Sequence, residues 1–557
     1  MQNAAIGGNR AARWIAPAIV LLVYAFLLAI TANVDPGDTR DYANSIAARF
    51  AGRDLYFWES GHLLWRPLGY LLVLVAYPVH PGVAQGALFQ KAVHALTAAS
   101  IAMGGVALLA FLAFQRRLGV RVVSAVGATI VLALTCAFLN FAQSGSSYVP
   151  AFAMLLMALW ALASSGAPAR VGAVSGVAFA ASVLLWLPMV FVVPVAALSQ
   201  LILRGDDRGR RSAAALACVV SGAIVIAAYA GVAVIERLYS AVLYRAWLLE
   251  ASHGIRDSGG AARAVIGLAR SSLSTAQLGI VAKRFLLGDP FAPATFADVV
   301  RAGLSRVLVF YAALALLLVA LAWYRQWRVL AFLALTAIPV LALAISWQGG
   351  DPERYFALFP ALFLAVGVAL SGPPARAGAL CTAALITIYV ALNFGDYSRA
   401  TSAQTCAALA RRMQSVPSIG GRPALVVTMT ADELTTIRGR CPDASILGRS
   451  DAPHLYGVFA PHVANAVQWR RMFAERALAA WGNGERVWIS TGLLRPSPPA
   501  EWHWAEGEDT RVHWRDFPAF FRRLSLCERC GGSRSFVEVI ASPGDVALLD
   551  SARRVAR

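Results

Sequence analysis

The sequence predicts a mainly α-helical, polytopic membrane protein of about eleven transmembrane helices, followed by an extracytoplasmic C-terminal α/β domain. Of its 557 residues, 58% are hydrophobic and only 14% are charged, which is far from the balance of a water-soluble domain. Apolar runs of about 17–25 residues recur along the chain, and an α-helix of that length crosses the hydrocarbon core of a bilayer. From residue 395 onward charged residues become frequent and such runs cease. We therefore divide the chain into a membrane domain, residues 1–394, and a C-terminal domain, residues 395–557.

The first apolar run, residues 14–31, follows a short basic leader. Because the run is long and lacks a small-residue cleavage pattern, we expect an uncleaved first helix rather than a signal peptide. Further spans are predicted at residues 92–114, 122–141, 149–165, 171–187, 189–203, 212–234, 304–324, 329–347, 356–371 and 377–394. Segment 67–79 is shorter and is bracketed by prolines, so we expect it at the membrane interface and not across the membrane.

Positive charge is distributed unevenly between the predicted loops. The net charge of +19 first suggests a nucleic-acid partner. Residues from 395 onward carry 21 Arg and 16 acidic residues, a net charge of +5, so the remaining +14 lies in the membrane domain. With the N-terminus in the cytoplasm, the inner loops hold Arg116, Arg117, Arg121, Arg170, Arg204, Arg208, Arg210, Arg211, Arg325, Arg328 and Arg376. The outer connections 142–148 and 347–355 are nearly free of positive charge. This asymmetry predicts a bacterial inner-membrane protein with a periplasmic C-terminal domain, and no nucleic-acid partner.

The regions outside the predicted spans differ in character. The outer loops are residues 33–91 and 235–303, and amphipathic stretches in the second are expected to lie along the outer membrane face. In the C-terminal domain we predict strands at 424–429, 486–490, 536–540 and 546–550, and helices at 403–414 and 466–481. This alternation is typical of a small α/β domain.

Cysteine usage agrees with this sidedness. Cys136, Cys218 and Cys381 lie inside predicted spans, where we expect them to be packing residues. The other four cysteines all lie in the C-terminal domain: Cys406, Cys441, Cys527 and Cys530. An even number in an oxidising compartment predicts two disulfides, with three pairings open. A four-cysteine zinc site is the alternative.

Acidic and basic side chains gather on the predicted outer side. Asp35, Asp38, Asp41, Asp54, Glu59, His62 and Arg66 come from the first outer loop, and Asp351, Glu353 and Arg354 come from the connection 347–355. A carboxylate there can act as a general base on an incoming hydroxyl, and an arginine can bind a leaving phosphate with both arms of its guanidinium. The first loop also holds enough carboxylates for a divalent metal ion. For any one acid the plain alternative is a solvated loop residue, and Asp38 could instead cap a helix that begins with TRDYANSIAARF.

Several segments resemble one enzyme family in the same order along the chain. DTRDYANSIAARFAGRDLY, followed by GHLLWRPLGYLL, resembles the first periplasmic loop of the GT-C fold glycosyltransferases of the protein-mannosyltransferase and aminoarabinose-transferase type. FQRRLGVRVVSAVGATIVLAL, GAVSGVAFAASVLLWLP and ERYFALFPALFLAVG are similar to an inner turn, a hairpin and a late span of that family. The resemblance covers roughly residues 14–372.

The resemblance implies a polyprenyl-phosphate sugar donor, a glycan, lipid or protein acceptor, and chemistry on the outer face. Asp38 would be the catalytic base, with Asp41 the second candidate, and Arg354 would lie near the donor phosphate. His62 and Arg66 would line the donor or acceptor groove. The expected substrate-binding residues on the outer side also include Glu59, Tyr148, Asp351 and Glu353.

The chain departs from the family pattern at two positions. The second outer loop, AQSGSSYVP, lacks the family's usual aspartate and offers Gln143, Ser144 and Tyr148 as polar contacts. The hairpin has Trp186 and Leu187 near the place of the family's lysine.

Two other function classes remain open at the level of sequence. A transporter or flippase of lipid-linked glycans would place ionisable residues inside its spans and often contains paired repeats, neither of which the sequence shows. A non-enzymatic scaffold with a partner-binding C-terminal domain would tolerate changes in the first-loop acids.

Overall fold

A computed structural model describes residues 12–32, 38–50, 52, 57–77, 85–250, 260–275, 278–287, 294–398, 425–428, 455–457, 466–482, 484, 486–496, 518–527 and 536–554. The chain divides into two compact units. The first contains Met1–Gly279 and Val300–Ser398, and the second contains Ile280–Val299 and Arg399–Arg557. The division at Ser398 lies close to the predicted boundary after residue 394. Residues 280–299, which we assigned to an outer loop of the membrane domain, group with the second unit.

In the described part of the chain up to Ser398, the elements are helices, with one isolated β-bridge between Thr31 and Ser398. Its elements are α1 (Ala12–Ile30), α2 (Thr39–Phe50), η1 (Ser60–His62), α3 (Trp65–Ala76), α4 (Gln85–Arg117), α5 (Val122–Ala133), α6 (Cys136–Phe141), α7 (Tyr148–Leu162), α8 (Pro168–Leu185), η2 (Leu187–Phe191), α9 (Val193–Ala197), α10 (Ser199–Arg204), α11 (Arg208–Ile235), α12 (Ala241–Glu250), α13 (Ala261–Ser272), α14 (Leu278–Leu287), α15 (Phe296–Val299), η3 (Val300–Leu304), α16 (Ser305–Trp323), α17 (Trp327–Ser346), η4 (Pro352–Leu358), α18 (Phe359–Ser371) and α19 (Ala375–Tyr397).

Seven helical segments of the described chain are long and apolar enough to cross a bilayer. They are Ala87–Arg117, Pro168–Leu185, Arg208–Ile235, Phe296–Trp323, Trp327–Ser346, Pro352–Ser371 and Ala375–Tyr397. Trp14–Ile30, Trp65–Ala76, Val122–Ala133 and Tyr148–Leu162 are apolar but shorter. The prediction of a polytopic membrane helix bundle is confirmed.

Two predicted spans do not form single helices. Residues 122–141 divide into α5 and α6, because Thr135 begins a new helix and its side-chain oxygen accepts a hydrogen bond from the backbone nitrogen of Phe138 (3.3 Å). Residues 189–203 divide between the end of η2, α9 and α10. Pro188 and Pro194 lack the backbone N–H that a continuous helix would need there.

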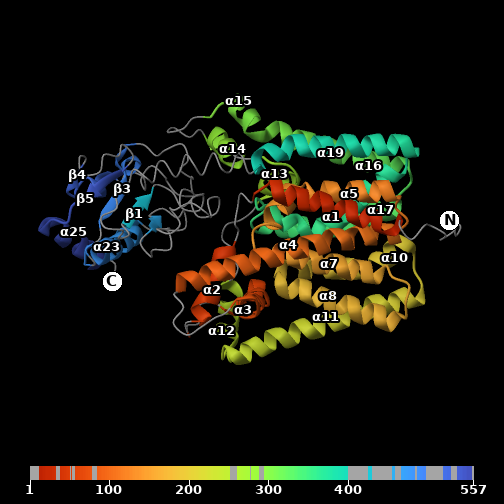
Figure 1. Ribbon diagram of the computed structural model, residues 1–557, viewed down its shortest axis with the longest axis horizontal. Coiled ribbons are helices and arrows are strands. Elements are labelled where there is room, and N and C mark those ends of the chain that lie inside the picture. The colour runs from red at the N-terminus through yellow and green to blue at the C-terminus, as the bar shows by residue number, and fades with distance from the viewer. Residues whose placement is uncertain are drawn as a thin grey trace. The chain divides into compact units, whose positions relative to one another are not determined.

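Helices α4, α7, α8 and α11 pack side by side, each against the next (Figure 1). Small residues set the spacing between α8 and α11. A Cβ atom on Gly172 would lie 2.7 Å from the carbonyl oxygen of Ala213, and one on Gly176 would lie 2.8 Å from that of Ala217. Close backbone approach at small residues four positions apart is a common way for membrane helices to associate.

The two ends of the first unit carry different side chains. At one end the arginine-rich connections meet: Arg204 donates to the carbonyls of Ala163 and Arg117, and Arg121 donates to the carbonyl of Pro373. At the other end lie α2, α3 and α12 (Figure 1). The loops predicted to be inner and the loops predicted to be outer are thus gathered at opposite ends.

Asn393 fastens three segments at the end that carries α2. Its side-chain nitrogen donates to the carbonyls of Leu134 (2.8 Å) and Ser272 (2.9 Å), and its side-chain oxygen accepts from the backbone nitrogen of Ser274 (2.9 Å). Asn393 is fully buried, so each of these bonds satisfies a polar group that water does not reach. The residue joins α19 to the end of α5 and to the end of α13.

The second unit contains a five-stranded sheet in the order β2-β1-β3-β5-β4. Its elements after Ser398 are β1 (Leu425–Thr428), β2 (Leu455–Gly457), α23 (Ala466–Gly482), β3 (Val487–Ser490), η5 (Thr491–Leu494), β4 (Leu526–Cys527), β5 (Phe536–Val539) and α25 (Pro543–Arg554). Strands β2, β1 and β3 are parallel, whereas β5 runs antiparallel to β3 and to β4. Predicted strands 424–429, 486–490 and 536–540 coincide with β1, β3 and β5. Predicted helix 403–414 lies outside the described residues, and the α/β class of the whole domain stays a prediction.

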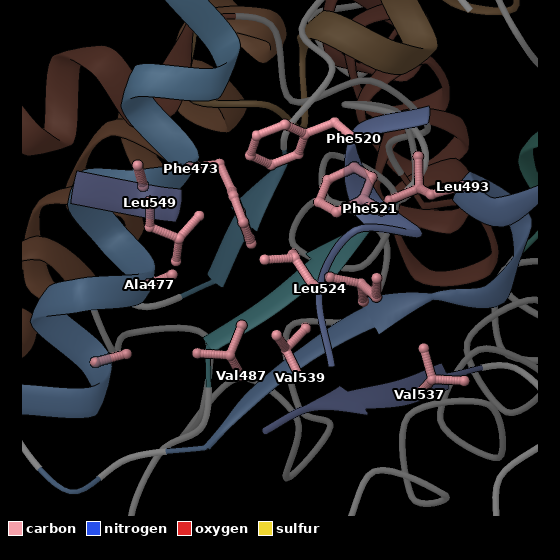
Figure 2. Packing of buried hydrophobic residues seen from close by; sticks show 13 residues of the cluster. Phe473, Ala477, Val487, Leu493, Phe520, Phe521, Leu524, Val537, Val539 and Leu549 are labelled. Carbon is pink, nitrogen blue, oxygen red and sulfur yellow. The ribbon is translucent and has the colours of Figure 1, made fainter. Parts of the chain in front are cut away.

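One face of this sheet packs against helices (Figure 2). Val487 and Ile489 of β3 pair in register with Val539 and Val537 of β5, so their side chains share that face. Figure 2 shows the core that these strands form with the side chains of Phe473, Ala477, Leu493, Phe520, Phe521, Leu524 and Leu549.

The predicted strand at 546–550 is wrong, because these residues belong to α25. Ser542 and Asp545 cap this helix reciprocally: the Ser542 hydroxyl accepts from the Asp545 backbone nitrogen (3.1 Å) and donates to the Asp545 carboxylate (2.5 Å). The capping signal in SPGD outweighs the apolar run that follows it.

Candidate active site

Asp38 lies immediately before α2 and shares one carboxylate oxygen among several side chains. The hydroxyls of Tyr148 and Tyr42 donate to Oδ2 of Asp38 over 2.5 and 3.2 Å. Nε2 of His62 lies 4.0 Å from the same oxygen. Burial raises the pKa of Tyr42 well above its ordinary value, and the Asp38 and Glu59 carboxylates raise it further, so the phenol stays a proton donor.

The loop before Tyr148 is fixed by side chains from three helices. Its three successive carbonyls, those of residues 144–146, accept hydrogen bonds from Thr39 Oγ1 (2.5 Å), Trp65 Nε1 (3.0 Å) and Ser100 Oγ (2.9 Å) respectively. At the bend, Gly145 has a φ of +70°, and a Cβ there would lie 2.9 Å from the backbone nitrogen of Thr97. The loop therefore acts as a support that carries Ser147 and Tyr148 into the site.

The two other polar residues that the sequence offers in this loop, Gln143 and Ser144, form contacts within the protein. Gln143 donates to Thr31 Oγ1 (2.9 Å) and to the Leu139 carbonyl (3.0 Å), and the Ser144 hydroxyl contacts Ser146 Oγ at 2.5 Å. Both side chains are engaged within the protein. Tyr148 is the residue of the loop that reaches Asp38.

His62 is held in a buried position on η1. Its Nδ1 lies 3.1 Å from the carbonyl oxygen of Leu185 and 2.6 Å from Ser147 Oγ. The rings of Tyr42 and Tyr148 pack edge-on against it, with centroids at 5.3 and 5.8 Å. Burial lowers the pKa of His62 below 6.5, although nearby carboxylates act in the opposite direction, so the ring is neutral at pH 7.

Arg66, at the start of α3, lies over the face of the Tyr42 ring. Its guanidinium is 5.1 Å from the centre of the Tyr42 ring, and Nη1 forms an ion pair with Oε2 of Glu59 at 2.5 Å. Both partners are largely buried. The predicted binding residues Glu59 and Arg66 thus contact each other and lie in the same cluster as His62.

The connection 347–355 forms the second half of the site. Arg354 is buried, stacks on the ring of Trp347 at 3.9 Å and donates through Nη2 to the side-chain oxygen of Gln348. Its Nε is buried and has no hydrogen-bond partner among the residues that the structure describes. Asp351 lies at the start of η4, where its carbonyl accepts from the backbone nitrogen of Arg354 (3.2 Å).

Helix α13 holds this connection in place. The Tyr355 hydroxyl lies 2.7 Å from the carbonyl oxygens of both Ala264 and Gly349. A Cβ on Gly267 would lie 1.9 Å from the Gly349 oxygen, so only glycine fits at this crossing. The position of the segment that carries Arg354 therefore depends on backbone contact with α13.

Tyr148 and Trp186 join the two halves. The Tyr148 ring packs against Trp186 with centroids 5.3 Å apart, and the Arg354 guanidinium lies 6.0 Å from the Trp186 ring. Glu353 and Arg354 are near enough to Tyr148 to act on its hydroxyl electrostatically. A base candidate, a buried cation and an aromatic wall thus meet at one site.

The remaining acidic residues of the first outer loop are not part of the described cluster around Asp38. Asp41 is exposed on α2, on a different side from the Tyr42 ring that faces the site. Asp35 and Asp54 lie outside the described residues. Sequence reasoning missed the roles of Ser147 and Trp186, because a serine in a short loop and a tryptophan at a helix end carry no chemical signature of their own.

Of the four cysteines in the C-terminal domain, only Cys527 lies among the described residues. Cys527 is disulfide-bonded, whereas Cys406, Cys441 and Cys530 lie outside the described residues, so the pairing stays a prediction. Cys136, Cys218 and Cys381 are free thiols. Among the residues that the structure describes, no three His, Cys, Asp or Glu side chains are grouped so as to hold a metal ion.

Neither a protein-family model nor a curated protein sequence matches the chain. Solved structures do. ArnT from Cupriavidus metallidurans, bound to undecaprenyl phosphate, matches with a TM-score of 0.51 at 15% identity, over 96% of this chain and 99% of that one. The oligosaccharyltransferase AglB from Archaeoglobus fulgidus, in complex with an inhibitory peptide and a dolichol-phosphate, reaches 0.48 at 12% identity, over 96% and 75%.

The match to ArnT extends over nearly the whole of both chains and is independent of the short motifs that first suggested a family. At 15% identity it establishes the architecture of the chain and leaves its chemistry to the site itself. The protein is a multi-pass membrane protein with the GT-C fold.

Proposed function

We propose that this protein is a membrane glycosyltransferase, which moves a sugar from a polyprenyl-phosphate donor to a hydroxyl group of a glycan, lipid or protein acceptor. The observation that carries the proposal is the meeting of Asp38 and Arg354 around Tyr148 and Trp186. A carboxylate and a buried guanidinium at one aromatic-lined site are the two groups that such a transfer needs. The undecaprenyl phosphate bound to ArnT supports a lipid phosphate as the donor's leaving group.

Each group has a defined part in the proposed reaction. Asp38 takes the proton of the acceptor hydroxyl as its oxygen attacks the anomeric carbon of the sugar. Arg354 stabilises the charge on the departing lipid phosphate, with its guanidinium held flat by Trp347. Tyr42 and Tyr148 orient the Asp38 carboxylate. No step of this scheme uses a metal ion, and a divalent ion as cofactor stays a prediction.

The activity is tested with the purified full-length protein in lipid nanodiscs. Polyprenyl-phosphate donors carrying a hexose, a pentose or an amino sugar are supplied with a membrane extract as acceptor source, and release of polyprenyl phosphate is measured. We expect protein-dependent release from at least one donor, and a changed glycan profile in a strain that lacks the protein. A flippase would move the donor across the bilayer of a vesicle without cleaving it. A scaffold would do neither.

We further propose that the site faces the periplasm of a bacterial inner membrane, with the N-terminus in the cytoplasm. The separation of the arginine-rich end from the Asp38 end supports this orientation, because positive loops stay on the cytoplasmic side. Alkaline phosphatase fused after Phe394 should be active in cells, and a fusion after Arg121 should be inactive. The reverse pattern would refute the orientation and place the chemistry in the cytoplasm.

A further inference from the structure

The contacts of His62 favour one position for the proton of its neutral ring. The Leu185 carbonyl, 3.1 Å from Nδ1, can only accept a hydrogen bond, so Nδ1 holds the hydrogen in the neutral ring. Ser147 Oγ, at 2.6 Å, is a second acceptor for the same hydrogen. Nε2 of His62 is consequently the nitrogen with the lone pair, and this nitrogen faces Asp38.

Two proton acceptors therefore face each other in a buried site. Nε2 of His62 and Oδ2 of Asp38 are 4.0 Å apart, and both lack a hydrogen when His62 is neutral and Asp38 is ionised. Oδ2 already accepts from the hydroxyls of Tyr42 and Tyr148, which disperse the charge on the carboxylate. A proton placed on Asp38 would have an unprotonated nitrogen directly opposite.

We propose that His62 is the proton relay of the site, which receives through Nε2 the proton that Asp38 takes from the acceptor hydroxyl. This inference rests on the proposed function. It makes His62 a residue that acts through Asp38, in addition to the groove-lining role that the sequence suggested.

The proton and electrons balance in each step. The acceptor O–H bond breaks to protonate Asp38, the acceptor oxygen bonds to the anomeric carbon, and the sugar–phosphate bond breaks with its electron pair on the phosphate. Asp38 then passes the proton to Nε2 of His62 and is a carboxylate again. The resulting imidazolium keeps its Nδ1–H bond to the Leu185 carbonyl, which favours the charged ring, and it forms an ion pair with Asp38. The imidazolium finally loses the proton to water.

The neighbours of His62 allow this cycle. Among the described residues, the charged and titratable groups that face the ring are Asp38, Tyr42, Glu59, Arg66 and Tyr148. The end of α8 contributes the Leu185 carbonyl, and η2 has no titratable side chain. On the adjoining α12, Tyr244 is half-buried and Arg245 is exposed. The two carboxylates stabilise a transient imidazolium, while burial keeps the resting ring neutral. The relay accepts protons only when neutral, so transfer should slow as the pH falls through the pKa of the ring, which burial lowers from its ordinary value.

The test compares wild type and His62→Asn in nanodiscs, because the asparagine amide can still donate to the Leu185 carbonyl. We expect kcat of the variant to fall about 10-fold or more at pH 7.5, the donor KM to stay unchanged, and the decline of kcat at acidic pH to disappear. Arg245→Gln, on the exposed side of α12, serves as control and should match wild type. A variant with the wild-type kcat and pH profile overturns the relay.

Two further readouts keep the proposal falsifiable if His62→Asn does not fold. The wild-type rate alone should fall as the pH is lowered through the pKa of His62 that NMR measures, and a flat profile across that pKa contradicts a relay. In ¹⁵N-histidine NMR of the full chain, Asp38→Asn should shift the titration of His62, and an unchanged titration also contradicts it. If the wild type transfers sugar while these tests fail, only the relay is lost. If no donor is cleaved by the wild type, the proposed function is lost and the relay with it.

Discussion

Asp38→Asn should reduce sugar transfer by about 10²- to 10⁴-fold, the usual contribution of a general base. Asparagine has nearly the same shape as aspartate, and its side-chain oxygen can still accept from the hydroxyls of Tyr42 and Tyr148. The loss should therefore appear in kcat, with little change in membrane abundance or donor KM. The measurement is release of polyprenyl phosphate by the purified variant.

Asp41→Asn is the matched control for this variant. Asp41 lies three residues further along, is exposed, and its backbone carbonyl accepts from the Ser45 hydroxyl (2.9 Å). The control variant should keep its activity within a few-fold of wild type. If Asp38→Asn retained more than a tenth of the wild-type kcat, or if both variants lost activity equally, Asp38 would not be the base.

Arg354→Gln should weaken use of the donor by roughly 10- to 150-fold in KM, since a hydrogen bond to a charged group contributes about 1.5–3 kcal/mol. The Arg354 guanidinium is stacked on Trp347, and its Nε has no hydrogen-bond partner in the described part of the chain, so it is placed to bind an added anion. Arg354→Lys should recover only part of the loss, because an ammonium has no planar fork and stacks poorly.

The control for the arginine is Arg376→Gln, an exposed arginine at the other end of the bundle, which should leave the donor KM unchanged. Equilibrium binding of free polyprenyl phosphate separates a phosphate contact from a catalytic one. If Arg354→Gln bound polyprenyl phosphate as tightly as wild type, the proposed phosphate contact would be wrong, whatever the effect on turnover.

The membrane architecture was predictable because apolar length is a direct physical requirement for crossing a bilayer. The predictions that failed concern single elements, the span 189–203 and the strand 546–550. The sequence showed Pro188, but the apolar run 189–203 concealed how far Pro194 divides it, and the cap formed by Ser542 and Asp545 was overlooked beside an apolar stretch. Hydropathy measures burial in lipid and does not record where a helix begins.

The candidate site was predictable in its charged members and not in its supports. Asp38 and Arg354 are conspicuous in an apolar chain, and loop sidedness already placed them on one face. Their joint position at Tyr148 and Trp186 depends on long-range packing, which leaves no pattern in the local sequence. The second outer loop even looked deficient without a carboxylate, although the structure uses it to hold Tyr148.

The second outer loop, residues 142–148, also affects how substrates would bind. The carbonyls of residues 144–146 are each held by a side chain from a different helix, through Thr39, Trp65 and Ser100. Ordering the backbone of a residue costs about 1–2 kcal/mol in conformational entropy, and here that loss accompanies folding and not association. The wall that carries Tyr148 is thus preorganised. A donor entering the site need not order this wall, so more of its contact energy can appear as affinity.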